Sequence, residues 1–241
     1  MILCVDMGNT FTHFAAMDGL AVVEQDRVPT AESGRLPPLA SDHRYDRVAV
    51  GSVAPSRTPA LLASLEHATG QPVLVAGQSL PIPVRNLARP PERVGVDRLL
   101  NVLAAWRRVH GQAVVVDIGT AITVDQLTAA GEFGGGAIAP GPDLLMRAMT
   151  RAELLPAVEF SLPPRAAGLD TDAAMRSGAW WGVVGAVERL IAQLRAEAPG
   201  PARVLATGGW AAALAPHIPS IHEVVPALTL EGLAIAASAV A

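Results

Sequence analysis

Residues 114–125, Val-Val-Val-Asp-Ile-Gly-Thr-Ala-Ile-Thr-Val-Asp, decide the fold that we predict for this chain. The β-branched run 114–116 predicts a buried strand, and the alternating residues after Gly119 predict a second strand. Asp117 would then lie at a tight turn. Because Gly119 has no Cβ, backbone N–H groups can approach a phosphate there, and Asp117 can hold a cation beside it. The alternative is a plain hairpin turn, since Asp and Gly are common in turns.

A second copy of this pattern lies near the start of the chain, in residues 2–12. When the two segments are aligned on their aspartates, Asp6 and Asp117, Gly8 aligns with Gly119 and Thr12 aligns with Thr123. Such a repeat predicts two similar half-domains rather than a solenoid array. Two such hairpins facing each other could hold the phosphates of a nucleotide, so the repeat favours a phosphate site over plain turns.

The composition indicates a globular protein and excludes several kinds of chemistry. Of the 241 residues, 51% are hydrophobic and 17% are charged, which suits one or two folded domains. The net charge of −4 does not suggest a nucleic-acid surface. All 18 basic residues are arginines, so no lysine can serve as a phosphate-loop residue, a Schiff base or a general base.

Other features predict a cytoplasmic protein without membrane contact. Cys4 is the one cysteine, so it cannot form an internal disulfide and suits a reducing compartment. Asp6 interrupts the first apolar run, which excludes a cleavable signal sequence of the usual kind. The apolar segment 227–241 contains Glu231 and is too short to span a bilayer.

Predicted strands and helices alternate along the chain. Hydrophobic periodicity predicts strands within residues 1–28 and at 48–53, 72–75 and 204–206, and helices at 58–67, 96–110, 142–152, 171–194 and 228–241. Residues 29–45 and 77–95 are expected to be loops. This alternation, with an antiparallel hairpin opening each half, favours an α/β fold of two lobes with mixed sheets. Ligands of such folds usually bind in the crevice between lobes.

Asp97 is a candidate catalytic residue because it falls in the first turn of the predicted helix 96–110. A helix N-terminus stabilises a carboxylate by roughly 0.3–1 kcal/mol, which keeps Asp97 ionised and able to accept a proton. An ordinary first-turn aspartate that only supports its helix is the alternative, and the spacing alone does not decide between the two.

Two glycine-rich segments are candidate ligand contacts. Three consecutive glycines, 134–136, permit close approach of a flat or charged ligand, and a flexible turn is the alternative. Thr207-Gly208-Gly209 follows a predicted strand and opens a helix, which suits the sugar or base of a nucleotide. By contrast, Trp180 and Trp181 are expected to be packing or interface residues rather than a stacking platform for bases.

Taken together, these segments resemble the type III pantothenate kinases, within the superfamily of acetate and sugar kinases, heat-shock chaperones and actin. The resemblance is carried by six segments in the order of that family: Asp6-Met7-Gly8-Asn9-Thr10, Gly95-Val96-Asp97-Arg98, Asp117-Ile118-Gly119-Thr120-Ala121, Gly135 to Gly141, Thr207-Gly208-Gly209 and Leu228 to Leu233. It implies an actin-like ATPase (ribonuclease H-like) duplicated fold, with an N-terminal lobe at 1–112 and a C-terminal lobe at 113–241.

The resemblance implies an ATP-dependent kinase that converts pantothenate to 4'-phosphopantothenate, the first step of coenzyme A synthesis. It implies that Asp97 is the catalytic base, and that Asp6 lies near Mg²⁺ and Asp117 at a site for K⁺ or NH₄⁺. Pantothenate would be bound by Gly95, Val96, Asp97, Arg98 and, from the partner subunit of a homodimer, Thr171. ATP would be bound by Asp6, Met7, Gly8, Asn9, Thr10, Phe11, Thr12, His13 and Thr120.

Two positions depart from the family pattern. The family usually has a tyrosine nine residues before the catalytic aspartate, where this chain has Ala88, and Ile122 stands where a threonine is common. A lost aromatic contact could weaken substrate binding by roughly 1–3 kcal/mol. Ala88 therefore motivates a different hypothesis, an inactive regulatory protein of the same fold. A further alternative is another kinase or a polyphosphate-type phosphatase of the superfamily, which would give 95–98 no special role.

Overall fold

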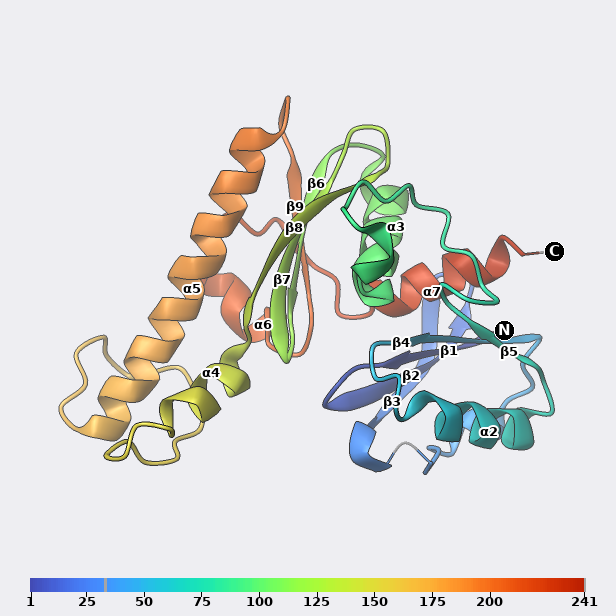
Figure 1. The fold of residues 1–241 in the computed structure, drawn as a ribbon, viewed down its shortest axis with the longest axis horizontal. Helices are drawn as coiled ribbons and strands as arrows, with labels where there is room; N and C mark the ends of the chain where they lie inside the picture. The colour runs from blue at the N-terminus through green and yellow to red at the C-terminus, as the bar shows by residue number, and fades with distance from the viewer. Residues whose placement is uncertain (33, 241) are drawn as a thin grey trace. The chain divides into compact units, whose positions relative to one another are not determined.

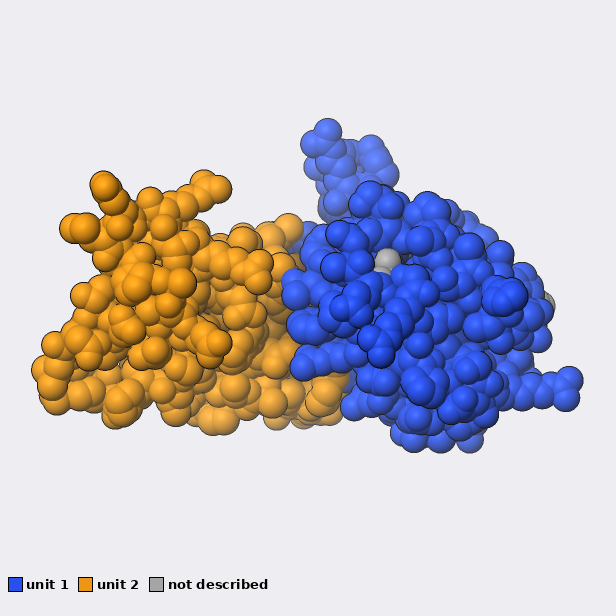
Figure 2. Space-filling view, turned by 90° about the horizontal axis from the view of Figure 1, so that it is seen from below, with its two compact units in different colours: residues 1–110, 131–133, 227–241 blue, residues 111–130, 134–226 orange. Residues whose placement is uncertain are grey.

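The computed structural model describes residues 1–32 and 34–240. It contains two five-stranded mixed sheets with flanking helices, which confirms the predicted fold class (Figure 1). Contacts within the chain define two compact units, which Figure 2 distinguishes by colour: unit 1 is residues 1–110, 131–133 and 227–241, and unit 2 is residues 111–130 and 134–226. The sequence suggested a boundary after residue 112, whereas the return of the last helix to unit 1 was not predicted.

Unit 1 is built on a sheet in which an antiparallel hairpin is extended by parallel strands. The sheet order is β3-β2-β1-β4-β5, where β1–β2 and β2–β3 are antiparallel and β1–β4 and β4–β5 are parallel. The elements of this unit are β1 (Ile2–Met7), β2 (Phe11–Asp18), β3 (Ala21–Pro29), η1 (Thr30–Glu32), α1 (Leu39–Asp42), β4 (Arg47–Ser52), α2 (Thr58–Thr69), β5 (Val73–Val75), η2 (Pro91–Arg93), α3 (Val96–Val109) and α7 (Leu228–Ser238).

Unit 2 repeats the central arrangement of unit 1. Its sheet order is β10-β9-β6-β7-β8, with β6–β7 antiparallel and β6–β9 parallel, so β7-β6-β9 corresponds to β2-β1-β4. The elements are β6 (Ala113–Ile118), β7 (Ala121–Leu127), β8 (Phe133–Pro140), α4 (Pro142–Met149), α5 (Thr171–Glu197), β9 (Arg203–Thr207), α6 (Ala211–Leu214), η3 (Ala215–His217) and β10 (Glu223–Val224). The long helix α5 packs against β6 and β7 (Figure 1).

Several local predictions need correction. Gly134–Gly136 form part of strand β8 rather than a turn, because Gly134 and Gly136 lie directly against the side chains of Gln126 and Asp125 on β7 and leave no room for a Cβ. The helix predicted at 142–152 ends at Met149, and the one predicted at 228–241 ends at Ser238; Ala241 lies outside the described residues. Within the described part of the chain, no helix is long and apolar enough to cross a bilayer.

Helix α3 is held against α7 by polar contacts and by one close backbone approach. A Cβ on Gly232 would lie 2.7 Å from the carbonyl carbon of Leu100, so only glycine permits this helix spacing. Arg108 donates to both carboxylate oxygens of Glu231, at 2.8 and 2.6 Å, and the Glu231 side chain is only 6% exposed. Since Asp97 is in the first turn of α3, these contacts also hold the helix that carries it.

We predict that Arg108→Ala destabilises the fold by about 3 kcal/mol, because it leaves the buried Glu231 carboxylate without its guanidinium partner. Urea unfolding at neutral pH measures this free energy. The control is Arg35→Ala, which removes the exposed ion pair to Glu32 at 3.5 Å and should cost less than about 1 kcal/mol. Equal losses in the two variants would contradict the assigned role of the pair.

Candidate functional site

In unit 1, the first hairpin places a carboxylate and an exposed turn at the end of β1. Asp6 pairs across the hairpin with His13, so the two side chains lie on the same face of the sheet. The turn between the strands closes with a hydrogen bond from the Gly8 N–H to the Phe11 carbonyl at 3.0 Å. Asn9 and Thr10 are exposed at the tip of this turn, where a ligand can reach them.

Thr30 stabilises this turn with two hydrogen bonds to its backbone carbonyls. Its hydroxyl donates to the Gly8 carbonyl at 2.9 Å, and its N–H donates to the Thr10 carbonyl at 2.9 Å. Thr12 is fully buried and its hydroxyl lies 3.1 Å from that of Thr30. The Thr12 side chain therefore supports the turn from inside the fold and is not presented to a phosphate. Sequence reasoning did not identify Thr30, since nothing in the loop 29–45 marks one hydroxyl above the others.

The remaining side chains of the hairpin carry little positive charge toward a ligand. Burial, and then the charge of Arg27, lower the pKa of His13, so this imidazole is neutral at neutral pH. Arg27 lies over the ring of Phe11, 4.5 Å from its centroid. Phosphate charge at this turn would consequently be met by backbone N–H groups and a metal ion rather than by histidine.

Asp97 lies in the first turn of α3, as predicted, and it is half-buried. One carboxylate oxygen, Oδ1, accepts a hydrogen bond from the Arg98 N–H at 2.8 Å. Burial raises the pKa of Asp97, and the hydrogen bond and charge of Arg98 partly offset this. Gly95 directly precedes the helix, and a Cβ there would overlap Asp97 Oδ1. A carboxylate with a raised pKa at a helix start is suited to accept a proton.

Val53 joins the start of α3 to the end of β1. Its N–H donates to the Met7 carbonyl at 3.0 Å, and its Cγ1 lies 3.5 Å from the position that a Cβ on Gly95 would occupy. The two predicted segments 6–13 and 95–98 therefore lie at the same edge of the first sheet. Ala88 lies in a segment whose residues Arg85 and Leu87 form backbone hydrogen bonds with Phe133.

In unit 2, three predicted segments meet at the end of β6. The Gly141 N–H donates to the Thr120 carbonyl at 3.1 Å, and the Trp210 N–H donates to the Ile118 carbonyl at 3.0 Å. Gly208, with φ of 93°, lies against the backbone of Ile118 and the carboxylate of Asp117, where a Cβ would clash with both. Residues 117–121, 135–141 and 207–209 are thus brought together around one turn.

The two hairpins differ by one residue in their turns. Met7 pairs with Thr12 in the first hairpin, but Ile118 pairs with Ile122 in the second, so Thr123 stands opposite Asp117 where His13 stands opposite Asp6. The alignment of Thr12 with Thr123 is therefore wrong by one position. Among the described residues, the buried Oγ1 of Thr123 has no hydrogen-bond partner.

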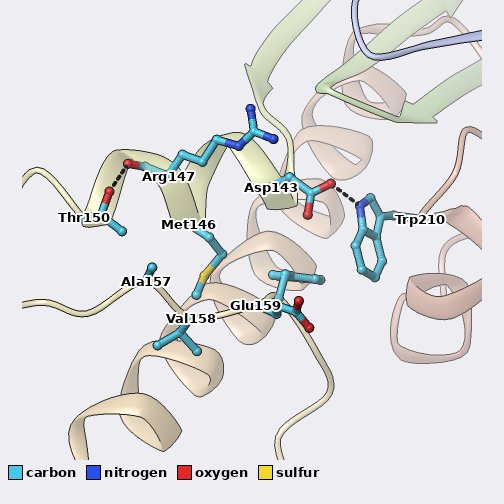
Figure 3. Close-up of a pocket in the computed structure, with 9 residues that line it drawn as sticks. Asp143, Met146, Arg147, Thr150, Ala157, Val158, Glu159 and Trp210 are labelled. Atoms are coloured by element: carbon cyan, nitrogen blue, oxygen red, sulfur yellow. Dashed lines mark hydrogen bonds between the residues drawn. The ribbon is translucent and has the colours of Figure 1, made fainter. Parts of the chain in front are cut away.

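A pocket of about 340 Å³ in unit 2 lies beside the end of the 207–209 segment (Figure 3). The indole N–H of Trp210 donates to Asp143 at 3.3 Å across it. The pocket carries two carboxylates and one guanidinium on apolar walls: it is lined by Asp143, Met146, Arg147, Thr150, Ala157, Val158, Glu159, Phe160 and Trp210. Sequence reasoning missed these residues, although the position of Trp210 directly after Gly208-Gly209 was a signal for it.

Helix α5 presents an exposed end and an exposed face. Thr171 is its first residue and is exposed, next to Asp170, whose side chain caps the helix by accepting from the Ala173 N–H at 2.7 Å. Trp181 is 42% exposed on the outer face of the helix, whereas Trp180 is buried. The predicted packing role is thus confirmed for Trp180.

The comparisons with known proteins identify the family. The family model described as type III pantothenate kinase matches residues 2–193. The chain belongs to the type III pantothenate kinase family. It is 37% identical over 252 residues to the type III pantothenate kinase of Moorella thermoacetica, and the match covers 98% of both chains.

Solved structures with similar folds are more distant in sequence. A Campylobacter jejuni structure described as a Baf family transcriptional activator has a TM-score of 0.62 at 18% identity, covering 98% of this chain and 97% of that one. Component A of (R)-2-hydroxyglutaryl-CoA dehydratase from Acidaminococcus fermentans has a TM-score of 0.53 at 14% identity, covering 98% and 95%. At these identities the similarity concerns the fold alone, and it gives the regulatory hypothesis no support.

Proposed function

We propose that this protein transfers the γ-phosphoryl group of ATP to the primary hydroxyl of pantothenate, forming 4'-phosphopantothenate for coenzyme A synthesis. The observation that carries the proposal is the half-buried carboxylate of Asp97. It lies at the same edge of the first sheet as the exposed turn that follows Asp6, and the chain belongs to this kinase family. The regulatory alternative gains no support from Ala88, because an inactive protein would not need Asp6, Asp97 and Asp117.

In this proposal Asp97 orients the substrate hydroxyl and accepts its proton as the oxygen attacks phosphorus. Phosphoryl transfer depends more on positioning and charge stabilisation than on covalent help from the protein. The raised pKa of Asp97 makes its carboxylate a stronger base than an exposed aspartate. Gly95 leaves room for Oδ1, and the Arg98 N–H fixes that oxygen, so the second oxygen, Oδ2, is the atom we assign to the substrate.

Arg98 would bind the carboxylate of pantothenate. A guanidinium presents N–H donors in one plane and suits a carboxylate in a two-point contact. Gly95 and Val96 bring the backbone at the start of α3 close to the same substrate. In unit 1, the exposed turn at Asn9 and Thr10 would contact ATP phosphates, and in unit 2 the predicted ATP contact is Thr120.

Because the chain has no lysine, divalent and monovalent cations would neutralise part of the negative charge of the ATP phosphates. No three His, Cys, Asp or Glu side chains gather into a metal site within the described residues. A single carboxylate, as at Asp6, nevertheless fits Mg²⁺, which usually keeps its waters and binds substrate phosphates. When bound, Mg²⁺ would neutralise charge that develops on the phosphoryl group.

The donor set around Asp117 fits K⁺ or NH₄⁺. The Asp117 carboxylate faces Gly208, and the unpartnered hydroxyl of Thr123 stands opposite Asp117 in the hairpin. Such a mixture of one carboxylate with neutral oxygens suits a weakly charged cation. We therefore assign the monovalent cation site to Asp117 and add Thr123 to it.

The nucleoside of ATP would bind beside Thr207-Gly208-Gly209. The pocket next to Trp210 has a volume of about 340 Å³, near the lower limit of ligand pockets, and an indole wall for a planar base. Its carboxylates at Asp143 and Glu159 could accept hydrogen bonds from an exocyclic amino group.

We also propose a homodimer in which Thr171 reaches the pantothenate of the partner subunit. The outer face of α5 supports this: Trp181 is exposed there, and Gly178, Gly182 and Gly185 leave open space next to the helix backbone. A face of small residues around one aromatic side chain allows a helix of a second copy to approach closely.

We predict that Asp97→Asn lowers kcat by about 10²- to 10⁴-fold while the protein stays folded, because the amide cannot accept the proton. In the unmodified enzyme, kcat/KM should fall as the pH decreases through the raised pKa of Asp97, above the ordinary range of aspartate. Assays of ADP release over pH measure both effects. Asp18→Asn, at the exposed end of β2, is the matched control and should keep full activity.

The same variant tests the raised pKa without an activity assay. The folded protein holds the proton on Asp97 more tightly than the unfolded chain, so this group lowers the free energy of unfolding as the pH rises from the ordinary aspartate pKa to the raised one. Asp97→Asn should therefore gain stability relative to the unmodified protein over this interval. A pH-independent difference in urea unfolding, or unchanged turnover, would remove Asp97 from the mechanism.

We predict that Thr123→Val raises the K⁺ concentration for half-maximal activity by about fivefold, since it removes one neutral oxygen ligand. In buffer without K⁺ or NH₄⁺, urea unfolding should show no loss of stability, because the lost hydroxyl has no partner among the described residues. Thr69→Val, on α2, should leave the K⁺ requirement unchanged. An unaltered K⁺ requirement in Thr123→Val would exclude Thr123 from the cation site.

We predict that Gly182→Arg converts a dimer to a monomer, because it places a long charged side chain on the outer face of α5. The substitution meets no neighbouring atom of its own chain, so folding should be unaffected. Sedimentation equilibrium measures the mass, and Gly34→Arg, in open space in unit 1, is the control. A monomeric unmodified protein at working concentration would exclude both the homodimer and the role of Thr171.

A further inference from the structure

The guanidinium of Arg98 lies over an aromatic ring that the sequence did not associate with the site. Its central carbon, Cζ, is 5.2 Å from the centroid of the Phe133 ring. Phe133 is 1% exposed and Arg98 is half-buried, so the ring and the guanidinium meet where little water reaches them. A cation over an aromatic face within about 6 Å is attracted by the ring quadrupole, and more strongly where water is excluded.

The position of Phe133 is fixed by the backbone on one side and by helix α3 on the other. Its N–H donates to the Arg85 carbonyl at 2.9 Å, and its carbonyl accepts from the Leu87 N–H at 3.0 Å. The neighbouring Glu132 forms an ion pair with Arg85 at 2.8 Å. These contacts explain why residues 131–133 belong to unit 1 although the chain on both sides of them belongs to unit 2.

Gly131 adds a second contact between this segment and α3. With φ of 80°, it packs against Trp106, and a Cβ there would lie 2.9 Å from Cε2 of the indole. Trp106 and Arg98 are eight residues apart, about two helical turns, and so lie along the same side of α3. The segment 131–133 therefore contacts α3 at two places, Trp106 and Arg98.

We propose that Phe133 is a positioning residue for pantothenate: its ring holds the Arg98 guanidinium in the place where it meets the substrate carboxylate. This inference rests on the proposed function, in which Arg98 binds that carboxylate. A cation–ring contact does not use the N–H donors of the guanidinium, which are the groups that recognise a carboxylate. A long side chain that is oriented before binding loses less conformational freedom when the substrate arrives.

The test replaces Phe133 with phenylalanines that carry one, two and three ring fluorines, a series that weakens the ring quadrupole stepwise and changes the shape of the ring little. The KM for pantothenate should rise with each fluorine, to about three- to tenfold. The kcat, the KM for ATP and the Tm should stay constant. The same series at Phe14, a fully buried core ring of unit 1, is the control and should leave the KM for pantothenate unchanged.

Arg98→Ala separates failure of this inference from failure of the proposed function. If Phe133 acts through Arg98, the KM for pantothenate is raised in Arg98→Ala and no longer changes with fluorination. The role of Phe133 alone would be overturned if Arg98→Ala raises the KM for pantothenate but fluorination of Phe133 does not change this KM in the protein that retains Arg98. An unchanged KM in Arg98→Ala would overturn the proposed role of Arg98 and, with it, this inference.

Discussion

The close packing of α3 on α7 is the constraint on which the unit 1 site depends. Gly232 allows the backbones to meet at Leu100, and the buried carboxylate of Glu231 receives two hydrogen bonds from Arg108. The hydroxyl of Thr229 also donates to Asn101 at 2.8 Å. Because α7 packs in turn on β1 and β4, α3 is oriented relative to the first sheet. The start of α3 then places Asp97 at the edge where β1 ends.

The duplicated hairpins show how one local structure can serve two purposes. Both place a carboxylate at the end of a strand that has an antiparallel neighbour on one side and a parallel neighbour on the other. The turn of the second hairpin is one residue shorter, so a different type of residue stands opposite each aspartate. Asp6 faces a histidine whose pKa is lowered, whereas Asp117 faces a threonine hydroxyl. We expect this difference to separate the surroundings of a divalent ion from those of a monovalent one.

The sequence predicted features that local chemistry determines, and it missed those that depend on distant partners. The hairpins, the first-turn position of Asp97 and the strand before Gly208 follow from periodicity and turn residues within a few positions. The register of Thr123 was missed, because a one-residue change in turn length leaves the Asp-x-Gly pattern intact. From the sequence, the glycines 134–136 were compatible with a turn. They form a strand because they pack closely against side chains of β7, which the sequence does not show. The roles of Phe133 and Thr30 depend on contacts with segments far along the chain, which no local pattern contains.

The most direct test of this account is ADP release by the purified, unmodified protein with ATP and Mg²⁺, measured with and without pantothenate and with and without K⁺ or NH₄⁺. We predict turnover that requires pantothenate and is activated by the monovalent cation, with Ala88 tolerated in the substrate site. Folded protein that binds ATP but releases no ADP over a wide range of pantothenate concentrations would contradict it.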